Sequence, residues 1–427
     1  MKKNDNVPGI GKSRNSASSD NYDSLVLLLR NFDENIRIDT IQKLGDLRET
    51  RAVRPLLGRF QNDKSPKVRY YAVEELFKLR DSINDSSLWS ILAEAMNEDN
   101  EEDEKVRAKI AEVLGFLNDS AFSNYLVTSL GDNSQIVWKA AAHSLGLIKD
   151  LDVIDELIEG LNEKSRHYST DKDATPYITA LIEMGPVVIR DVLFSIEDEE
   201  LGIHESQNRE YIPSVYYESH FNDRLEIISK IGIAALPEIK KILSTDDCYD
   251  SALFLISEAL ANIGGTDSLK ILCSLTKDKH HEAIRWVSIN GLKRIYNLNP
   301  EMVFQTLINV LEKDNVSEVQ EEAIEGLAIL KNSKATPLLG SILLDSGDFY
   351  LRLASAIALG DIMDPFALDM LGSALGTDRN EDVRIAAATA LGKINNKSAI
   401  PYLDATTSDD MSIRVREAAK AALSNYK

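Results

Sequence analysis

Two histidines and a glutamate stand side by side at His280, His281 and Glu282, in a chain of 427 residues that holds six histidines. Imidazole and carboxylate groups are common metal ligands, so this cluster could in principle bind a metal ion. Successive side chains on a helix point about 100° apart, however, so adjacent histidines offer a poor shared metal face. We therefore expect polar residues at a turn between helices here, and we expect no metal and no other cofactor.

A second group of histidines lies in residues 162–222, which are also rich in tyrosine. The three histidines could form a metal site, and the tyrosines could dock a partner or cover a ligand, since tyrosine offers a large contact area at low entropic cost. Equally, these side chains could fill the gap left by an irregular repeat. The candidates are His167, His204, Tyr211, Tyr216, Tyr217 and His220.

The motifs of the common catalytic sites are missing from the sequence. It contains no Gly-x-Ser-x-Gly elbow, no Gly-x-x-x-x-Gly-Lys-Ser/Thr loop and no Cys-x-x-Cys pair. We therefore predict no catalytic residues and favour a protein that is not an enzyme.

The composition limits the partners and the compartment. With 69 acidic against 48 basic residues, the formal net charge is −21, which argues against binding to nucleic acid. No apolar run approaches the length of about 18 residues that a membrane helix needs, and the first residues lack the apolar core of a signal peptide. Two cysteines do not make a disulfide framework. We expect a cytoplasmic protein, not inserted in a membrane, with a disordered tail at residues 1–20.

The remaining chain repeats one pattern. In segments such as 349–362 and 381–394, an apolar residue, here called the anchor, precedes an arginine and is followed by small and apolar residues up to a Leu-Gly pair. The last three anchors, Leu351, Val383 and Val415, are 32 residues apart. This period, with two helical patterns per copy, is typical of an α-solenoid. We predict an all-α, right-handed solenoid of about twelve helical hairpins.

Each position that recurs between the copies has a physical reason. Small or apolar residues recur 4, 7, 8 and 11 positions after the anchor, which is the spacing of a buried helical stripe. Glycine at position +9, as in Gly45 and Gly360, favours close approach of a neighbouring helix over a left-handed cap. Regular repeats are expected at 21–161 and 223–427, with an irregular or degenerate region at 162–222, all in one continuous solenoid.

An arginine follows the anchor in most copies, and an aspartate often precedes the anchor by five residues. A charge row that binds a ligand is one interpretation. The fixed phase favours a structural ladder, in which each aspartate caps a helix and pairs with an arginine of a neighbouring repeat. The residues are Arg37, Arg69, Arg107, Arg285, Arg352, Arg384 and Arg416, with Asp63, Asp132, Asp250, Asp314, Asp378 and Asp410.

The whole pattern, "D…VRxxAAxALGxI…AIPxL", resembles the HEAT repeats of the phycobilisome-lyase-like subtype over roughly residues 30–425. The resemblance implies that the helix with the arginine lines the concave side of the solenoid. One branch, similar to deoxyhypusine hydroxylase, holds a di-iron centre through His-Glu pairs that follow the arginine. Here the pair His281-Glu282 precedes its anchor, Ile284, so the phase differs from that of the enzyme.

If the arginine helix lines the concave side, positions +2, +3, +6 and +10 point inward. The copies differ at these positions, and variable residues on a constant frame are where recognition is expected. Aromatic residues, with acids toward the C-terminal half, favour a basic or amphipathic segment of another protein as the partner. Trp138 takes an arginine position and is expected at the edge of the same surface. The predicted contact residues are Tyr70, Tyr71, Lys109, Trp138, His143, Glu258, Trp286, Glu321, Glu322 and Glu325.

The sequence therefore predicts a scaffold or adaptor without catalysis of its own, which captures such a partner segment on its concave face. Family members also include chromophore-lyase subunits and a few enzymes, so fold transfers better than function. The alternative is an accessory subunit of the phycobilin-lyase-like type that handles a chromophore or another ligand at residues 162–222.

Overall fold

The computed structural model describes residues 15–83, 87–165, 174–195, 219–245 and 248–426. Every regular element in these ranges is a helix, which confirms the predicted all-α solenoid class. The chain divides into two units, residues 1–191 and 192–427. None of the described helices is long and apolar enough to cross a membrane.

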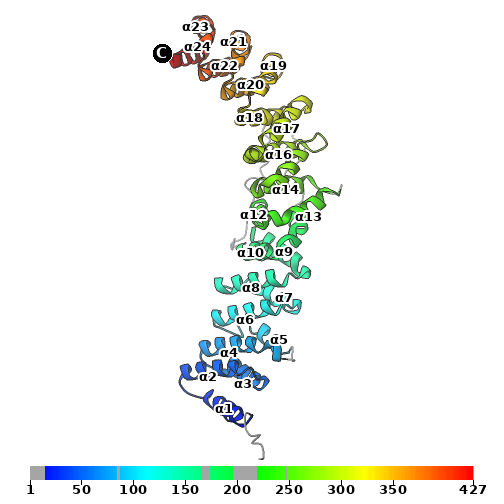
Figure 1. Cartoon of the computed structure of the whole chain (residues 1–427), viewed down its shortest axis with the longest axis vertical. Helices are drawn as coiled ribbons and strands as arrows, with labels where there is room; N and C mark the ends of the chain where they lie inside the picture. Colours follow the sequence, from blue (N-terminus) through cyan, green and yellow to red (C-terminus); the bar gives the residue numbers. More distant parts are fainter. Residues whose placement is uncertain (1–14, 84–86, 166–173, 196–218, 246–247, 427) are drawn as a thin grey trace, which may run out of the picture. The chain divides into compact units, whose positions relative to one another are not determined.

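The first unit has two layers of helices (Figure 1). The arginines that follow the anchors lie in even-numbered helices, and these helices pack on one another in chain order. We call them the even layer, and here they are α2 (Glu34–Asp46), α4 (Pro66–Lys78), α6 (Glu104–Leu117), α8 (Gln135–Ile148) and α10 (Thr175–Met184). The odd layer consists of α1 (Asn15–Leu28), α3 (Val53–Asn62), α5 (Ser87–Glu94), α7 (Ser123–Ser129) and α9 (Ile154–Ser165), and α11 (Ile189–Phe194) crosses the unit boundary.

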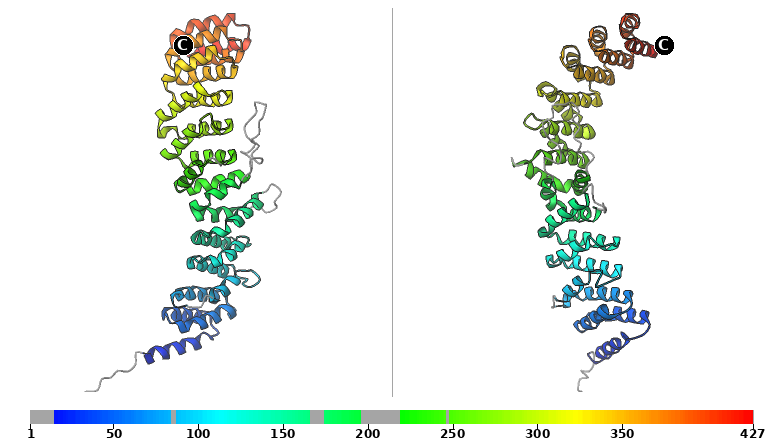
Figure 2. Two further views of the ribbon diagram at one scale, coloured as in Figure 1. Left: turned by 90° about the vertical axis from the view of Figure 1, so that its right-hand side faces the viewer. Right: turned by 180° about the vertical axis from the view of Figure 1, so that it is seen from behind.

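The second unit repeats this arrangement, and Figure 2 shows the stacked hairpins from two further directions. Its even layer consists of α12 (Ser219–Ile231), α14 (Asp250–Ile263), α16 (Glu282–Ile295), α18 (Ser317–Leu330), α20 (Phe349–Ile362), α22 (Glu381–Ile394) and α24 (Ile413–Leu423). Its odd layer consists of α13 (Leu236–Leu243), α15 (Gly265–Leu275), α17 (Pro300–Lys313), α19 (Thr336–Asp345), α21 (Leu368–Thr377) and α23 (Ile400–Asp409).

Local sequence signals fix the helix ends. Asn380 is the N-cap of α22, and its side chain accepts the N–H groups of Asp382 and Val383. The same helix ends at Asn395, whose φ of 50° is left-handed and stops the helix. A 3-10 turn, Lys397–Ala399, then leads into the next odd helix.

The glycines at position +9 allow neighbouring even helices to approach closely. A Cβ on Gly360 would lie 2.8 Å from the Cα of Ala390, and one on Gly392 would lie 3.0 Å from the Cα of Ala422. Gly264 is the exception, because its φ of 69° makes it a left-handed cap with nothing near its missing side chain. Close packing is therefore the role of the first two glycines.

The structure differs from the sequence analysis at the N-terminus and adds helices to the irregular region. α1 begins at Asn15, inside the segment 1–20 that was expected to be disordered. α10, α11 and the start of α12 fall within residues 162–222. The predicted domain boundaries otherwise remain predictions.

Candidate functional site

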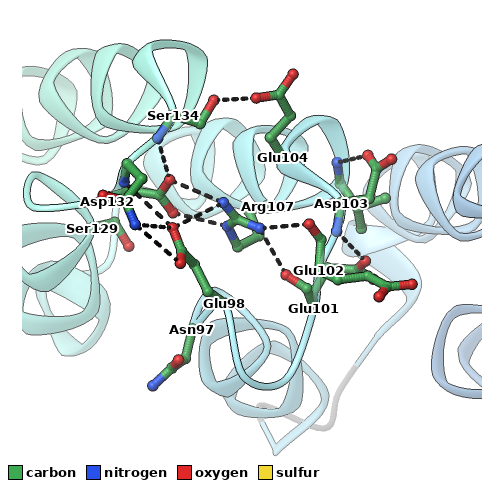
Figure 3. A network of polar contacts seen from close by, with 12 residues as sticks. Asn97, Glu98, Glu101, Glu102, Asp103, Glu104, Arg107, Ser129, Asp132 and Ser134 are labelled. Carbon is green, nitrogen blue, oxygen red and sulfur yellow. Dashed lines mark hydrogen bonds and ion pairs between the residues drawn. The ribbon is translucent and has the colours of Figure 1, made fainter.

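Arg107 on α6 shows the arrangement that the arginines of the even layer share (Figure 3). Its Nε and Nη2 donate to Oδ2 and Oδ1 of Asp132, in the following repeat, at 2.8 and 2.9 Å. Its Nη1 donates at 2.9 Å to the carbonyl oxygen of Glu101, in the loop before α6. The two side chains are 5% and 4% exposed, so this bidentate pair forms a nearly buried rung between two repeats.

Similar rungs occur in both units, with bidentate N–O distances from 2.6 to 3.1 Å. Arg416 donates instead to the carbonyl oxygens of Asp410 and Met411. The further rungs are Arg37–Asp63, Arg69–Glu101, Arg285–Asp314, Arg352–Asp378 and Arg384–Asp410.

The aspartates of the rungs are not N-caps, so that part of the sequence prediction is wrong. Asp378 and Asp410 are the C-cap residues of α21 and α23. Each accepts, through Oδ1, the N–H group of the residue two positions later, which is the true N-cap of the next even helix. Asp250 differs again, since it is the first residue of α14.

Sequence reasoning missed two members of this charged framework. Glu101 takes the aspartate position five residues before the anchor Val106 and binds Arg69. Arg224 on α12 is 1% exposed and donates from Nε to Oγ of Ser195 at 2.8 Å. Both could have been found by allowing glutamate for aspartate and by aligning "NDRLEII" (222–228) with the other copies.

The rung is replaced between α18 and α20. Gln320 stands at the arginine position and keeps only the backbone contact, donating to the carbonyl oxygen of Asp314 at 2.9 Å. Ser346 stands at the matching aspartate position, and its Oγ accepts the N–H group of Asp348 at 3.2 Å. These two helices are therefore joined without the bidentate pair.

Two of the rungs also lower the pKa of their aspartates, Asp378 and Asp410. A hydrogen bond from Arg384 is the main cause that lowers the pKa of the Asp410 carboxyl. Burial raises the pKa of Asp378, but Arg352 and the N–H group of Asn380 outweigh burial and lower it overall. Both carboxylates are thus held ionised by their cationic partners.

The structure separates the predicted contact residues into surface and interior groups. Glu258, Glu322 and Trp138 are buried, being 6, 7 and 7% exposed, and were wrongly assigned to the open surface. Adjacent even helices approach closely enough to enclose the two glutamates. Arg294 binds Glu258 at 2.9 Å, and Lys293 binds Glu322 at 2.6 Å.

The other predicted contact residues are at least partly accessible. Trp286 on α16 is half-buried. His143 on α8 is exposed, with Nδ1 3.9 Å from Glu183 Oε2. The remaining five line two separate grooves, one in each unit.

We call the groove in the first unit the α4–α6 groove. It has a volume of about 680 Å³ and is lined by Glu34, Ser65, Pro66, Lys67, Tyr70, Tyr71, Asp103, Lys105, Ala108, Lys109, Glu112 and Ile136. Tyr70 and Tyr71 meet edge to face, with ring centroids 5.5 Å apart. Lys109 Nζ lies 5.1 Å from the Tyr70 ring centroid and 2.6 Å from Glu112 Oε2. Burial lowers the pKa of the Lys109 ammonium, but its bonds to Glu112 and Tyr70 raise it overall.

We call the groove in the second unit the α18–α20 groove. It has a volume of about 640 Å³ and is lined by Glu321, Glu325, Ala328, Ile329, Lys331, Tyr350, Leu353, Ala354, Ile357, Ala358 and Asp361. Its floor is apolar, and Ile329 and Ile357 are 41 and 46% exposed. Its rim holds three carboxylates and one ammonium group.

The structure describes the histidine cluster at His280 and His281, but little of the histidine group in residues 162–222. His281 is the N-cap of α16, and its Nδ1 accepts the N–H group of Ala283 at 3.2 Å. Burial lowers the pKa of His280. In the part of the chain that the structure describes, no three histidine, cysteine, aspartate or glutamate side chains are grouped to hold a metal ion. Of the candidates in the irregular region, the structure describes only the backbone of His220, at the start of α12. The others lie outside the described residues: His167, His204, Tyr211, Tyr216 and Tyr217.

Several solved structures match this chain at low similarity. An engineered protein is 19% identical, with 95% of this chain and 98% of that chain covered and a TM-score of 0.35. The karyopherin Kap121p bound to the extreme C-terminus of the protein phosphatase Cdc14p is 15% identical, with 95% and 45% covered and a TM-score of 0.41. Human deoxyhypusine hydroxylase in complex with glycerol is 16% identical, with 90% and 99% covered and a TM-score of 0.25.

These similarities concern the fold alone, and this chain spans about half the length of the karyopherin chains. No curated protein sequence matches the chain. The family model of HEAT repeats, in contrast, matches residues 90–170, 236–328, 284–360 and 336–424. The matched ranges cover more than half of the sequence, and the chain therefore belongs to the HEAT-repeat family.

Proposed function

We propose that this protein is a binding scaffold that captures a basic, amphipathic helical segment of a partner protein in the α18–α20 groove. The observation that carries the proposal is the combination of an open apolar floor with a mainly acidic rim. Amphipathic helices commonly bind by placing their apolar face in such a groove. Basic residues that flank this face would then meet the carboxylates of the rim.

The apolar floor supplies the binding energy in this proposal. Ile329 on α18 and Ile357 on α20 both expose more than two-fifths of their surface. Tyr350, at the start of α20, is 37% exposed and lies on the same groove. Covering these side chains would remove apolar surface from water, at roughly 25 cal/mol per Å².

The acidic rim supplies the selectivity. Glu325 pairs with Lys293 at 2.8 Å and Asp361 pairs with Lys393 at 2.7 Å, and both lysines belong to helices outside the groove. These pairs reach solvent, because Glu325 and Asp361 are 64 and 40% exposed. The Asp361–Lys393 pair has both side chains at least 40% exposed and contributes little, so a cation of the partner can compete with it. Glu325 is 64% exposed although Lys293 is only 15% exposed, so a further cation can approach this carboxylate from its solvent side.

The test is a binding titration with the full chain and a fluorescent amphipathic helical peptide of leucine and lysine. Ile357→Asp should weaken binding about tenfold or more, because it places a charge on the apolar floor. Leu344→Asp is the matched control, since Leu344 is 44% exposed but belongs to α19 in the odd layer. Equal loss in the two variants, or none in either, would overturn the proposal.

A second pair of variants tests the rim. Glu321→Lys with Glu325→Lys should weaken the same peptide and reduce the salt dependence of its binding, because attractive charges are removed. The control, Glu312→Lys with Glu318→Lys, changes the net charge equally at two exposed residues that do not line the groove. Unchanged affinity in the rim variant would show that the acids do not select the partner.

Three finer expectations from the sequence belong with this proposal and remain predictions. They are the phycobilisome-lyase-like subtype, a cytoplasmic location, and the alternative of a ligand-handling subunit. The alternative depends on residues of the 162–222 region, most of whose candidates lie outside the described part of the chain.

A further inference from the structure

We propose that the α4–α6 groove is a second docking site, and that it takes a short acidic segment carrying an apolar or aromatic anchor. The chain would then hold two segments of opposite charge, one in each unit. This inference stands apart from the proposed function, because it depends on other residues and another partner chemistry.

The apolar part of the groove can hold an anchor side chain. Tyr70 and Tyr71 form an edge-to-face pair, and Pro66 and Ala108 lie on the same groove. Ile136, from the first turn of α8, is 42% exposed. An aromatic or aliphatic side chain placed here would contact rings and methyl groups from three successive even helices.

The carboxylates of the groove are engaged by groups of the groove itself. Glu34 accepts from Oγ of Ser65 at 2.7 Å. Asp103 is the N-cap of α6 and accepts the N–H group of Lys105 at 3.0 Å. Glu112 is bound to Lys109, whose side chain is only 18% exposed. An incoming cation would have to compete with all three of these arrangements.

The ammonium groups of Lys67 and Lys105, in contrast, can still bind a carboxylate of a partner. The Lys105 ammonium has no ion-pair partner among the described residues. Lys67 has a side chain that is 73% exposed, and its contact with Glu34 is long, at 3.4 Å. Two lysines on successive even helices can therefore take new carboxylate partners without breaking a strong bond. This charge complementarity selects an acidic segment over a basic one.

The experiment uses the full chain and two fluorescent peptides, each with a central Phe-Leu pair, flanked by aspartate and glutamate in one and by lysine in the other. In the chain with Ile357→Asp, which disables the α18–α20 groove, the acidic peptide should bind more tightly than the lysine-flanked one. Lys67→Glu with Lys105→Glu should weaken it about tenfold, as expected for the loss of two exposed ion pairs and their replacement by repulsion. Arg54→Glu with Lys64→Glu is the control, because it changes the net charge equally at exposed residues that do not line the groove.

Ile136→Asp provides a second readout that does not depend on the lysines. It should also weaken the acidic peptide, because the anchor loses its apolar contact and meets a repelling charge. Equal effects of the groove and control variants, or no binding of the acidic peptide, would overturn the inference.

The two proposals fail separately in this design. The lysine variant should leave the amphipathic leucine-lysine peptide of the proposed function unaffected. Ile357→Asp, which disables the α18–α20 groove without adding cations, should in turn leave the acidic peptide unaffected. If only the leucine-lysine peptide fails to bind, the proposed function is wrong and the second site stands.

Discussion

Removing one carboxylate from the ladder should loosen one end of the second unit and leave the rest in place. Asp410 accepts two hydrogen bonds from Arg384, at 2.7 and 3.1 Å, and one from the N–H group of Ser412, at 2.8 Å. The side chains of Arg384 and Asp410 are 14 and 9% exposed. Asp410→Ala would therefore leave a nearly buried guanidinium without its anionic partner.

The expected cost is about 2 to 3 kcal/mol, which is below the value for a fully buried pair because Arg384 retains some solvent and its bond to the carbonyl oxygen of Asp378. In a repeat protein this cost falls on the neighbouring repeats, so a global melting temperature is a poor readout. Hydrogen exchange measured by mass spectrometry is the better assay. Amides of α23 and α24 should exchange about 30- to 150-fold faster, while those of α14 and α16 remain unchanged.

The effect should also depend on pH in a defined direction. Arg384 lowers the folded-state pKa of Asp410 below its ordinary value of 3.8. The stabilisation is therefore fully present above about pH 4 and is lost as the pH falls through the folded-state pKa. The difference between wild type and Asp410→Ala should shrink in the same acidic range.

A double-mutant cycle decides whether the pair is the cause. Arg384→Met with Asp410→Ala should cost less than the sum of the two single changes, because the second change removes the charge that the first leaves unpaired. Additive effects, or unchanged exchange of α24 in Asp410→Ala, would refute the assignment of this pair as a stabilising link.

Three further predictions concern stability. Gly360→Ala should destabilise α20 and α22 by about 1 to 3 kcal/mol, because its Cβ would lie 2.8 Å from the Cα of Ala390. Gly58→Ala, which has nothing within 4 Å, should instead stabilise α3 by about 0.5 to 1 kcal/mol, and local hydrogen exchange compares the two variants. Glu75 is fully buried, with Oε1 bound to Lys78 at 2.7 Å and Oε2 unpaired, and burial raises its pKa. Glu75→Leu should therefore stabilise the first unit by about 1 kcal/mol at pH 7. The gain should disappear below about pH 4.5, because the wild-type penalty begins where the unfolded chain ionises and is complete only above the raised folded-state pKa; unchanged exchange of the α4 amides at pH 7 would contradict this. Gln320→Arg with Ser346→Asp should restore the rung between α18 and α20 and slow exchange there about tenfold, and slower exchange in either single variant would contradict the pairing.

The periodic part of the fold could be predicted from the sequence because the copies pack their helices in the same way. In most copies the anchor and the residues 4 and 8 positions later are buried, as Val68, Ala72 and Leu76 show, although Ile36, the anchor before Arg37, is 39% exposed. The glycine at position +9 pointed to close packing because a neighbouring helix backbone needs that space. Gly264 shows the limit of this reasoning, since the same position can also serve a left-handed turn.

The candidate site was harder to predict because a helical pattern does not give the distance between helices. Position +3 is open at Tyr71 but enclosed at Glu322, where Lys293 and Asn290 of the preceding even helix reach the carboxylate. Nor does the pattern say which side chains of different repeats meet. That Lys109 lies over Tyr70, and so belongs to a groove of mixed charge, follows only from the packing of α4 on α6.

The most direct test of the scaffold proposal is a hydrogen-exchange footprint of the amphipathic leucine-lysine peptide on the full chain. Saturating peptide should slow the exchange of amides in α18 and α20, residues 317–330 and 349–362, and leave the odd helices α17 and α19 unchanged. Protection confined to other helices, or no protection at saturation, would contradict the assignment of the α18–α20 groove as the binding site.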